Sequence, residues 1–351
     1  MKQILQDLST GLTTIEECPS PLLTHNSLRI TTTTSLISAG TERMLVGFGK
    51  SSYINKARQQ PEKVKMVFDK IITDGLKPTI ESVRSKLSEP ISLGYSNVGI
   101  VEEVSPDIKD YKAGDRVVSN SPHADVVVAK RNLCALIPNN VDDQSAAFTV
   151  VGSISLHGVR LANPTIGESF AVIGVGLIGL LAVQILRANG CRVIAVDFDD
   201  GKLSMASKFG AEIINPKSSQ NFNKIIDDFS RGNGVDGVII AASTQSNEPI
   251  KQAAQICRKR GRIILIGVVG LELNRTDFYD KEISFQVSCS YGPGRYDLNY
   301  EDSGNDYPIG YVRWTEQRNF EAFLDMLSNR SIDVQPLISS QYDFLDANQA
   351  Y

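Results

Sequence analysis

The segment from Ser169 to Ala188 constrains the fold more than any other part of this 351-residue chain. An apolar run ends at Gly174-Val175-Gly176-Leu177-Ile178-Gly179, and an apolar helical pattern follows at once. The first glycine permits a tight turn, the second a close backbone approach, and the third close packing of helix on strand. Backbone N–H groups at the positive end of such a helix bind a pyrophosphate. The segment therefore predicts a dinucleotide-binding βαβ unit.

The choice of dinucleotide depends on Asp197, which ends the next apolar run eighteen residues after Gly179. A carboxylate at that position accepts the adenosine-ribose hydroxyls and repels the additional phosphate of NADP. Phe198-Asp199-Asp200 adds negative charge and no Arg follows, so we expect NAD. The expected cofactor contacts are Gly174, Gly176, Leu177, Ile178, Gly179, Asp197, Phe198, Ala242, Gly267 and Val268.

Two patterns of predicted secondary structure divide the chain. Residues 149–291 alternate apolar strands with helices, which is typical of a parallel sheet covered by helices. Residues 1–148 contain short β-type runs separated by turn residues, which favour a partly open β-barrel or a small sandwich. A charged, helical stretch at about 51–88 interrupts this β-rich region, and residues 292–351 return to it. The strands are expected at 27–38, 97–104, 116–118, 125–128, 169–173, 191–196, 235–241 and 262–268, and the later helices at 177–188, 202–209, 249–257 and 319–328.

Composition excludes several classes of protein. The net charge of −4 gives no reason to expect nucleic acid or an anionic membrane as a partner. No apolar run is long enough to span a bilayer, and the first residues lack an apolar signal core, so we expect a cytoplasmic protein. The five cysteines are scattered and never form a Cys-x-x-Cys pair, which indicates neither a disulfide framework nor a zinc knuckle.

Motifs spread along the chain resemble those of the medium-chain dehydrogenase/reductase superfamily, the zinc alcohol dehydrogenase-like proteins. Residues 99–104 and 111–117 resemble its GroES-like signature, His123-Ala124-Asp125-Val126 its "HAEY" strand, and residues 171–190 its nucleotide loop. The resemblance implies a GroES-like β-rich barrel joined to a Rossmann doubly wound sheet. It also implies a homodimer paired through the last strand of the nucleotide domain, near residues 282–290, and a chain that continues beyond Tyr351.

The zinc-binding motifs of that superfamily are altered here. Ala39-Gly40-Thr41-Glu42 stands where a ligating Cys begins the motif, Gly94-Tyr95-Ser96 where a His ligates, and Val151 near the third ligand. Ala and Val offer no donor atom and Tyr is a poor zinc ligand, so we expect no metal. The stretch 292–316 resembles the dehydrogenase half of bi-domain oxidoreductases, which are fused to a Gfo/Idh/MocA-type domain and often occur in polysaccharide gene sets.

Without zinc, a general acid/base and hydrogen-bond donors must serve hydride transfer. Tyr95 is the first candidate, because it replaces the ligating His; the alternative is that it fills the space of the metal. Glu42 is the second, although pairing with an Arg is an alternative role. Ser155 and His157 fall where family members contact the nicotinamide, and simple helix packing is the alternative for His157.

Arg295, Tyr296, Arg313 and Trp314 form a polar aromatic set that could recognise a hydroxyl- or phosphate-bearing substrate, or could belong to a solvated loop. The first functional hypothesis is an NAD-dependent dehydrogenase of a secondary alcohol or carbonyl on a sugar-like substrate. A zinc-free quinone or enone reductase and a non-catalytic NAD-binding subunit are the alternatives.

Overall fold

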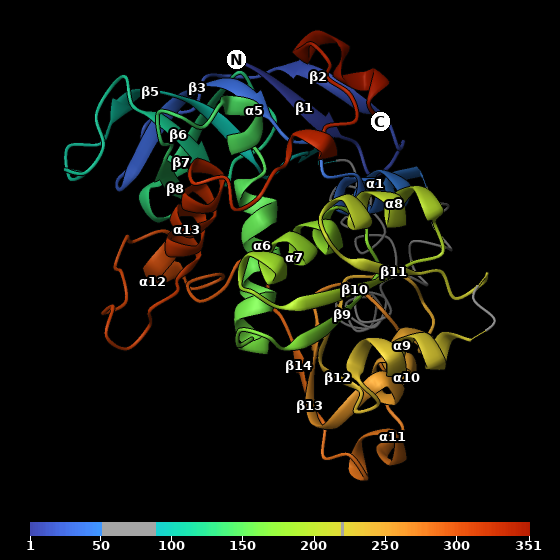
Figure 1. Ribbon diagram of the computed structural model, residues 1–351. Helices are drawn as coiled ribbons and strands as arrows, with labels where there is room; N and C mark the ends of the chain where they lie inside the picture. Colours follow the sequence, from blue (N-terminus) through green and yellow to red (C-terminus); the bar gives the residue numbers. More distant parts are fainter. Residues whose placement is uncertain (51–88, 219–220) are drawn as a thin grey trace, which may run out of the picture.

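The computed structural model describes residues 1–50, 89–218 and 221–351. The chain has a GroES-like β-rich domain and a Rossmann α/β domain, which confirms the predicted fold class. Figure 1 shows the antiparallel sheets in the upper part of the molecule and the parallel sheet below them. The predicted helical insert at 51–88 lies outside the described residues.

The Rossmann sheet has six parallel strands in the order β11-β10-β9-β12-β13-β14. This is the order of a doubly wound sheet, and its direction of winding reverses between β9 and β12. The strands are β9 (Ser169–Ile173), β10 (Arg192–Val196), β11 (Glu212–Ile214), β12 (Val235–Ile240), β13 (Cys257–Leu265) and β14 (Ser284–Val287). The helices between them are α7 (Leu177–Ala188), α8 (Asp200–Lys208), α9 (Phe222–Ser230), α10 (Glu248–Ile256) and α11 (Arg275–Tyr279).

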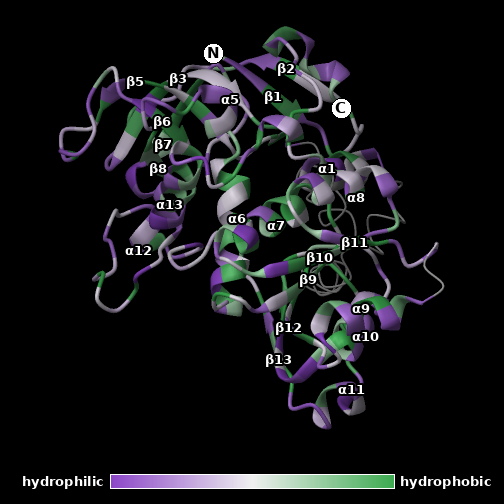
Figure 2. Cartoon of the chain, viewed as in Figure 1, coloured by the Kyte–Doolittle hydropathy of each residue, from purple (hydrophilic) through white to green (hydrophobic). Residues whose placement is uncertain are grey.

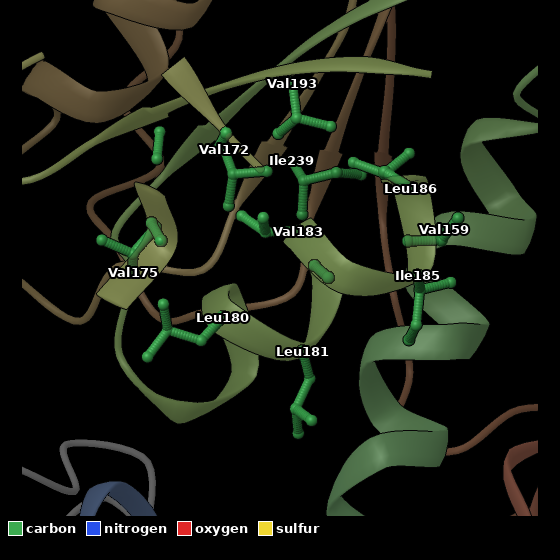
Figure 3. Close-up of a cluster of buried hydrophobic side chains, with 14 of the residues drawn as sticks. Val159, Val172, Val175, Leu180, Leu181, Val183, Ile185, Leu186, Val193 and Ile239 are labelled. Atoms are coloured by element: carbon green, nitrogen blue, oxygen red, sulfur yellow. The ribbon is translucent and has the colours of Figure 1, made fainter. Parts of the chain in front are cut away.

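Apolar side chains on both faces of this sheet explain its burial. Every residue of β9 is buried, and α7 packs Val183 and Leu186 toward Val172 and Ile239 of the sheet (Figure 3). Figure 2 shows α7 and the inner strands largely in hydrophobic green and the outer helix α11 largely in hydrophilic purple. A strand that is apolar on both faces must be covered by helices on both sides.

The GroES-like region contains a five-stranded antiparallel sheet in the order β7-β3-β5-β6-β8 and a three-stranded sheet in the order β2-β1-β4. Helix α1 follows β3 and carries Glu42. The strands are β1 (Lys2–Gln6), β2 (Thr13–Glu17), β3 (Ser27–Ser35), β4 (Ile91–Ser92), β5 (Asn97–Val104), β6 (Arg116–Ser119), β7 (Val126–Lys130) and β8 (Cys134–Leu136), and the helices are α1 (Ala39–Lys50) and α5 (Asp143–Ala146).

Helix α6 (Thr149–Ala162) joins the two regions. Its Val150 packs in the core of the β-rich region, whereas Val151 and Val159 pack in the core under α7. After β14 the chain returns through α12 (Leu298–Glu301) and α13 (Glu316–Ser328), and its last short helix (Phe344–Gln349) lies beside β2 (Figure 1). Among the described residues, no helix combines the length and apolarity needed to cross a bilayer.

Most predicted elements are confirmed, and the differences have physical causes. Strand β5 has the predicted bounds, whereas β13 begins at Cys257 and ends at Leu265, because Cys257 already pairs with Val235 before an irregularity in the ladder. Helix α13 begins three residues earlier than predicted, at Glu316, because the Thr315 side chain caps it by accepting from the Arg318 N–H.

Candidate functional site

The glycine loop has the geometry that its sequence predicts. Gly174 has a φ of +86°, and a Cβ there would lie 2.6 Å from the backbone nitrogen of Ala242. A Cβ on Gly179 would lie 2.0 Å from the Gly174 carbonyl oxygen, so only glycine lets α7 pack this close to the loop. A Cβ on Gly176, the residue before α7, would meet nothing within 4 Å. The space in front of the helix is thus open to a ligand.

Asp197 lies across the loop at the end of β10. Its Oδ2 accepts a hydrogen bond from Val175 N at 2.8 Å, and its Oδ1 accepts from Phe198 N and Asp199 N at 2.7 and 3.0 Å. The Lys217 ammonium lies 4.9 Å from the centre of the Phe198 ring, which is 61% exposed. Three backbone N–H groups therefore fix the orientation of the Asp197 carboxylate, and the Lys217 ammonium lies at the ring of the next residue.

The other expected cofactor contacts meet at the same edge of the sheet. A Cβ on Gly267 would lie 2.1 Å from the Ala242 carbonyl oxygen, which also accepts from Val268 N at 3.0 Å. Leu177 and Ile178 begin α7 beside them. The structure thus brings the predicted cofactor residues together at the carboxyl ends of β9, β10, β12 and β13, the usual ligand crevice of a doubly wound sheet.

A buried polar network surrounds Glu42 in the GroES-like region. Its Oε1 accepts from Ser38 N at 2.8 Å, and its Oε2 accepts from His123 Nε2 at 3.1 Å and from the Tyr351 hydroxyl. Glu42 and His123 are 0% and 1% exposed. Among the described residues, the charged partner of Glu42 is the imidazole of His123 and not the Arg of the alternative interpretation.

Tyr95 lies beside this network. Burial raises the pKa of its phenol above the ordinary value, with the nearby Glu42 charge acting in the same direction and the neighbouring side chains of Ser38 and Thr41 opposing it. Gly94, the preceding residue, has a φ of +87°, and a Cβ on it would lie 2.5 Å from the His123 ring. The His123 ring therefore packs directly against the backbone of Gly94. The Nδ1 atom of His123 lies 2.8 Å from Ser35 Oγ, which helps to hold the ring there.

The two candidates on α6 point to different neighbours. Ser155 Oγ donates to the Ile178 carbonyl oxygen at 2.8 Å, so it contacts the start of α7. The His157 ring lies against Gly292, whose Cβ would be 3.1 Å from His157 Nδ1. Burial, and secondarily the charge of Arg160, lowers the pKa of His157 to about 4, so its imidazole is neutral near pH 7.

The predicted substrate set divides into two groups. Arg295 pairs with Glu301 at 2.6 Å, and its guanidinium stacks on the Tyr296 ring at 4.2 Å. The Trp314 indole contacts the guanidinium groups of Arg313 and of Arg160 on α6. The Glu316 N–H donates to the Pro293 carbonyl oxygen at 2.9 Å, which joins the two segments that carry these pairs.

Several residues that the sequence did not single out take part in these groups. His123 and Tyr351, the partners of Glu42, lie 81 and 309 residues from it in the sequence. No local sequence pattern could therefore predict either contact. Glu316 is 0% exposed and both of its carboxylate oxygens have no hydrogen-bond partner among the described residues. Within those same residues, no cluster of three or more His, Cys, Asp or Glu side chains could hold a metal ion.

Known proteins that are similar to this chain include dehydrogenases and reductases. The family profile described as "Zinc-binding dehydrogenase" matches residues 178–301. D-xylulose reductase A of Aspergillus oryzae is 25% identical over 303 residues, which cover 76% of this chain and 77% of that protein. These matches show that the chain is similar to zinc-type dehydrogenases.

Solved structures also share the fold of this chain. The structure titled short chain alcohol dehydrogenase from E. coli CFT073, complexed with NADH, has a TM-score of 0.73 and 20% identity, and the match covers 100% of this chain and 94% of that one. Mycobacterial Rv1454c, complexed with NADPH, has a TM-score of 0.69 and 18% identity, with 100% and 95% covered. At these identities the likeness concerns the fold.

Proposed function

We propose that this protein is an NAD-dependent oxidoreductase that transfers hydride to or from a secondary alcohol or carbonyl of a sugar-like substrate, without catalytic zinc. The observation that carries the proposal is the Asp197 carboxylate, fixed on the backbone of an open glycine loop at the crevice of the sheet. The relative that is a D-xylulose reductase supports a polyol or ketose as the substrate class.

The crevice fits a nicotinamide dinucleotide. N–H groups at the start of α7 would hold the pyrophosphate, and Asp197 would accept from the adenosine ribose. When bound, the nicotinamide supplies or accepts the hydride. Asp197 favours NAD because a carboxylate repels the additional phosphate of NADP, although Lys217 at the Phe198 ring acts in the opposite sense. The two solved structures described above bind NADH and NADPH, which supports a nicotinamide dinucleotide as the cofactor of this chain.

Chemistry at the substrate oxygen falls to Tyr95 in this proposal. A phenol is protonated near neutral pH, and burial, which raises the pKa of Tyr95, favours the same form. The phenol can therefore donate a hydrogen bond to a carbonyl oxygen that gains charge during reduction. Ser38 and Thr41 orient the phenol, and Glu42 and His123 hold the backbone on which Tyr95 stands. Ser155 fixes α6 against the start of α7.

The side chains at the altered zinc motifs support the zinc-free part of the proposal. Ala39 and Val151 carry no donor atom, and Glu42 and His123 are bonded to each other rather than free to ligate. We also propose a cytoplasmic homodimer that pairs through β14, because β14 is an end strand of the sheet and its Val287 is 54% exposed. A Gfo/Idh/MocA-type oxidoreductase domain, in the same or a second chain, is the proposed partner.

Calorimetric titration with NAD⁺ and NADP⁺ tests the cofactor. We expect Asp197→Ala to weaken NAD⁺ binding by about tenfold or more, which is the loss of one or two charge-assisted hydrogen bonds, and to narrow the preference over NADP⁺. The exposed Asp200→Ala is the matched control. Unchanged NAD⁺ affinity in Asp197→Ala would refute the assignment.

Turnover tests the rest of the function. A panel of ketoses and polyols should include a substrate that is oxidised or reduced equally well before and after treatment with a zinc chelator. Loss of that activity on chelation, with recovery on addition of zinc, contradicts the zinc-free proposal. Binding of NAD⁺ without turnover of any member of the panel, alone or with the partner domain, points to a non-catalytic subunit.

A further inference from the structure

Residues 344–351 pack against the three-stranded sheet and α1. The short helix Phe344–Gln349 contacts β2, and its Ala347 is 5% exposed. Ala347 belongs to a small buried core whose other members are Ile4 of β1, Val46 of α1 and Leu93. Tyr351 is half-buried and packs against this core, which holds its ring beside α1.

The Tyr351 hydroxyl donates to Oε2 of Glu42 and completes a set of three donors. The other two are His123 Nε2, on the same oxygen at 3.1 Å, and Ser38 N, on Oε1 at 2.8 Å. The Glu42 side chain is 0% exposed, so each of these donors takes the place of a hydrogen bond from water. Burial, together with the charge of Glu42, raises the pKa of Tyr351, so its hydroxyl keeps its proton and remains a donor.

Glu42 connects Tyr351 to the surroundings of Tyr95. Its carboxylate accepts from Ser38 N, and its own N–H donates to the Ser38 carbonyl oxygen at 3.0 Å, so the two residues close the first turn of α1. Ser38, Thr41 and Glu42 are also the residues whose side chains act on the pKa of the Tyr95 phenol. The neighbours of that phenol therefore belong to the turn that the Glu42 carboxylate closes.

We propose that Tyr351 is a positioning residue of the candidate site, whose hydroxyl holds the Glu42 carboxylate and, through it, the first turn of α1 beside Tyr95. This role rests on the proposed function, in which the Tyr95 phenol donates to the substrate oxygen. A buried carboxylate that loses one of three donors is held less firmly, and the turn that it closes is loosened with it. Displacement of a reacting group by about 1 Å lowers a rate by up to about 10²-fold.

Turnover measures the positioning. Tyr351→Phe removes the hydroxyl and keeps the ring, and should lower kcat by about tenfold or more. KM for NAD⁺ should not change, because the glycine loop lies in the Rossmann domain. In a Tyr95→Phe background the same change should lower kcat no further, since residues that act through one another are not additive. Tyr342→Phe is the matched control, because Tyr342 lies in the same segment and is 47% exposed. Wild-type kcat in Tyr351→Phe, or an equal loss in the Tyr95→Phe background, overturns the proposal.

Amide hydrogen exchange measures the hold on α1 without turnover. Tyr351→Phe should speed exchange in peptides that span residues 36–43 by about tenfold or more, the change expected for loss of one hydrogen bond to a charged group. Peptides from β9 should keep the wild-type rate, which shows that the variant is folded, and Tyr342→Phe should change neither. Unchanged exchange at residues 36–43 overturns the role of Tyr351 even where substrates are turned over. Faster exchange without turnover of any substrate supports the hold of Tyr351 on α1 and refutes the proposed oxidoreductase instead.

Discussion

Gly94→Ala is expected to destabilise the protein far more than Gly114→Ala, although the two glycines share a backbone conformation. Their φ angles are +87° and +91°, in the left-handed region where an alanine costs about 1–2 kcal/mol. At Gly114 an added Cβ meets nothing within 4 Å, whereas at Gly94 it would lie 2.5 Å from the His123 ring. The difference between the variants therefore isolates the contact with His123.

His123 cannot move aside at low cost. Its ring nitrogens lie 2.8 Å from Ser35 Oγ and 3.1 Å from Glu42 Oε2, and the side chain is 1% exposed. Displacing the ring removes one of the three hydrogen bonds to the fully buried Glu42 carboxylate, and losing a hydrogen bond to a charged group costs about 1.5–3 kcal/mol. Added to the backbone strain, the loss of unfolding free energy is roughly 2.5–5 kcal/mol for Gly94→Ala and about 1–2 kcal/mol for Gly114→Ala.

Urea unfolding followed by far-ultraviolet circular dichroism measures both variants beside the wild type. A chain of two regions can unfold in more than one transition, so the comparison uses the transition that His123→Ala also shifts. If Gly94→Ala and Gly114→Ala agree to within about 1 kcal/mol, the His123 ring is not held as described and the reasoning fails.

Three further predictions concern the site and the fold. Tyr95→Phe should lower kcat by about 10²–10⁴-fold with little change in KM if the phenol serves as the proton donor, and wild-type kcat would exclude that role. Gly179→Ala should abolish NAD⁺ binding in calorimetry, since its Cβ would overlap the Gly174 carbonyl, and preserved binding would contradict the loop geometry. Burial raises the pKa of Glu316 to about 8 from 4.5, so the folded state retains a proton that the unfolded chain releases. Stability should therefore fall as pH rises from about 4.5 to 8, and Glu316→Gln should flatten that slope in urea titrations at several pH values.

The Rossmann half could be predicted from sequence because its signals are local. A strand, the loop at Gly174 and a helix follow one another within twenty residues, and each leaves its own pattern of apolar and glycine residues. The predicted bounds of β5 and β9 are those of the structure. The candidate site could be predicted only in part, since its contacts depend on how distant segments meet.

Two examples show that limit. Glu42 was expected to pair with an Arg, but the antiparallel sheets bring His123 to it from 81 residues away. Trp314 was grouped with its neighbours in sequence, and its contact with Arg160 of α6, 154 residues earlier, leaves no local signal. Residue types alone could not predict these contacts. A buried carboxylate can pair with an Arg or a His, and an indole can stack on any Arg that the fold brings to it.

Helix α6 has a consequence for any attempt to divide this chain. Val150 contributes to the core of the β-rich region and Val151, one residue later, to the core beneath α7. If the chain is divided before α6, the β-rich region loses Val150 from its core. If it is divided after α6, the Rossmann region loses Val151 from its core. Two separately expressed halves would each require their own copy of this helix, and their soluble yield with and without it is a practical measure of how far either half is autonomous.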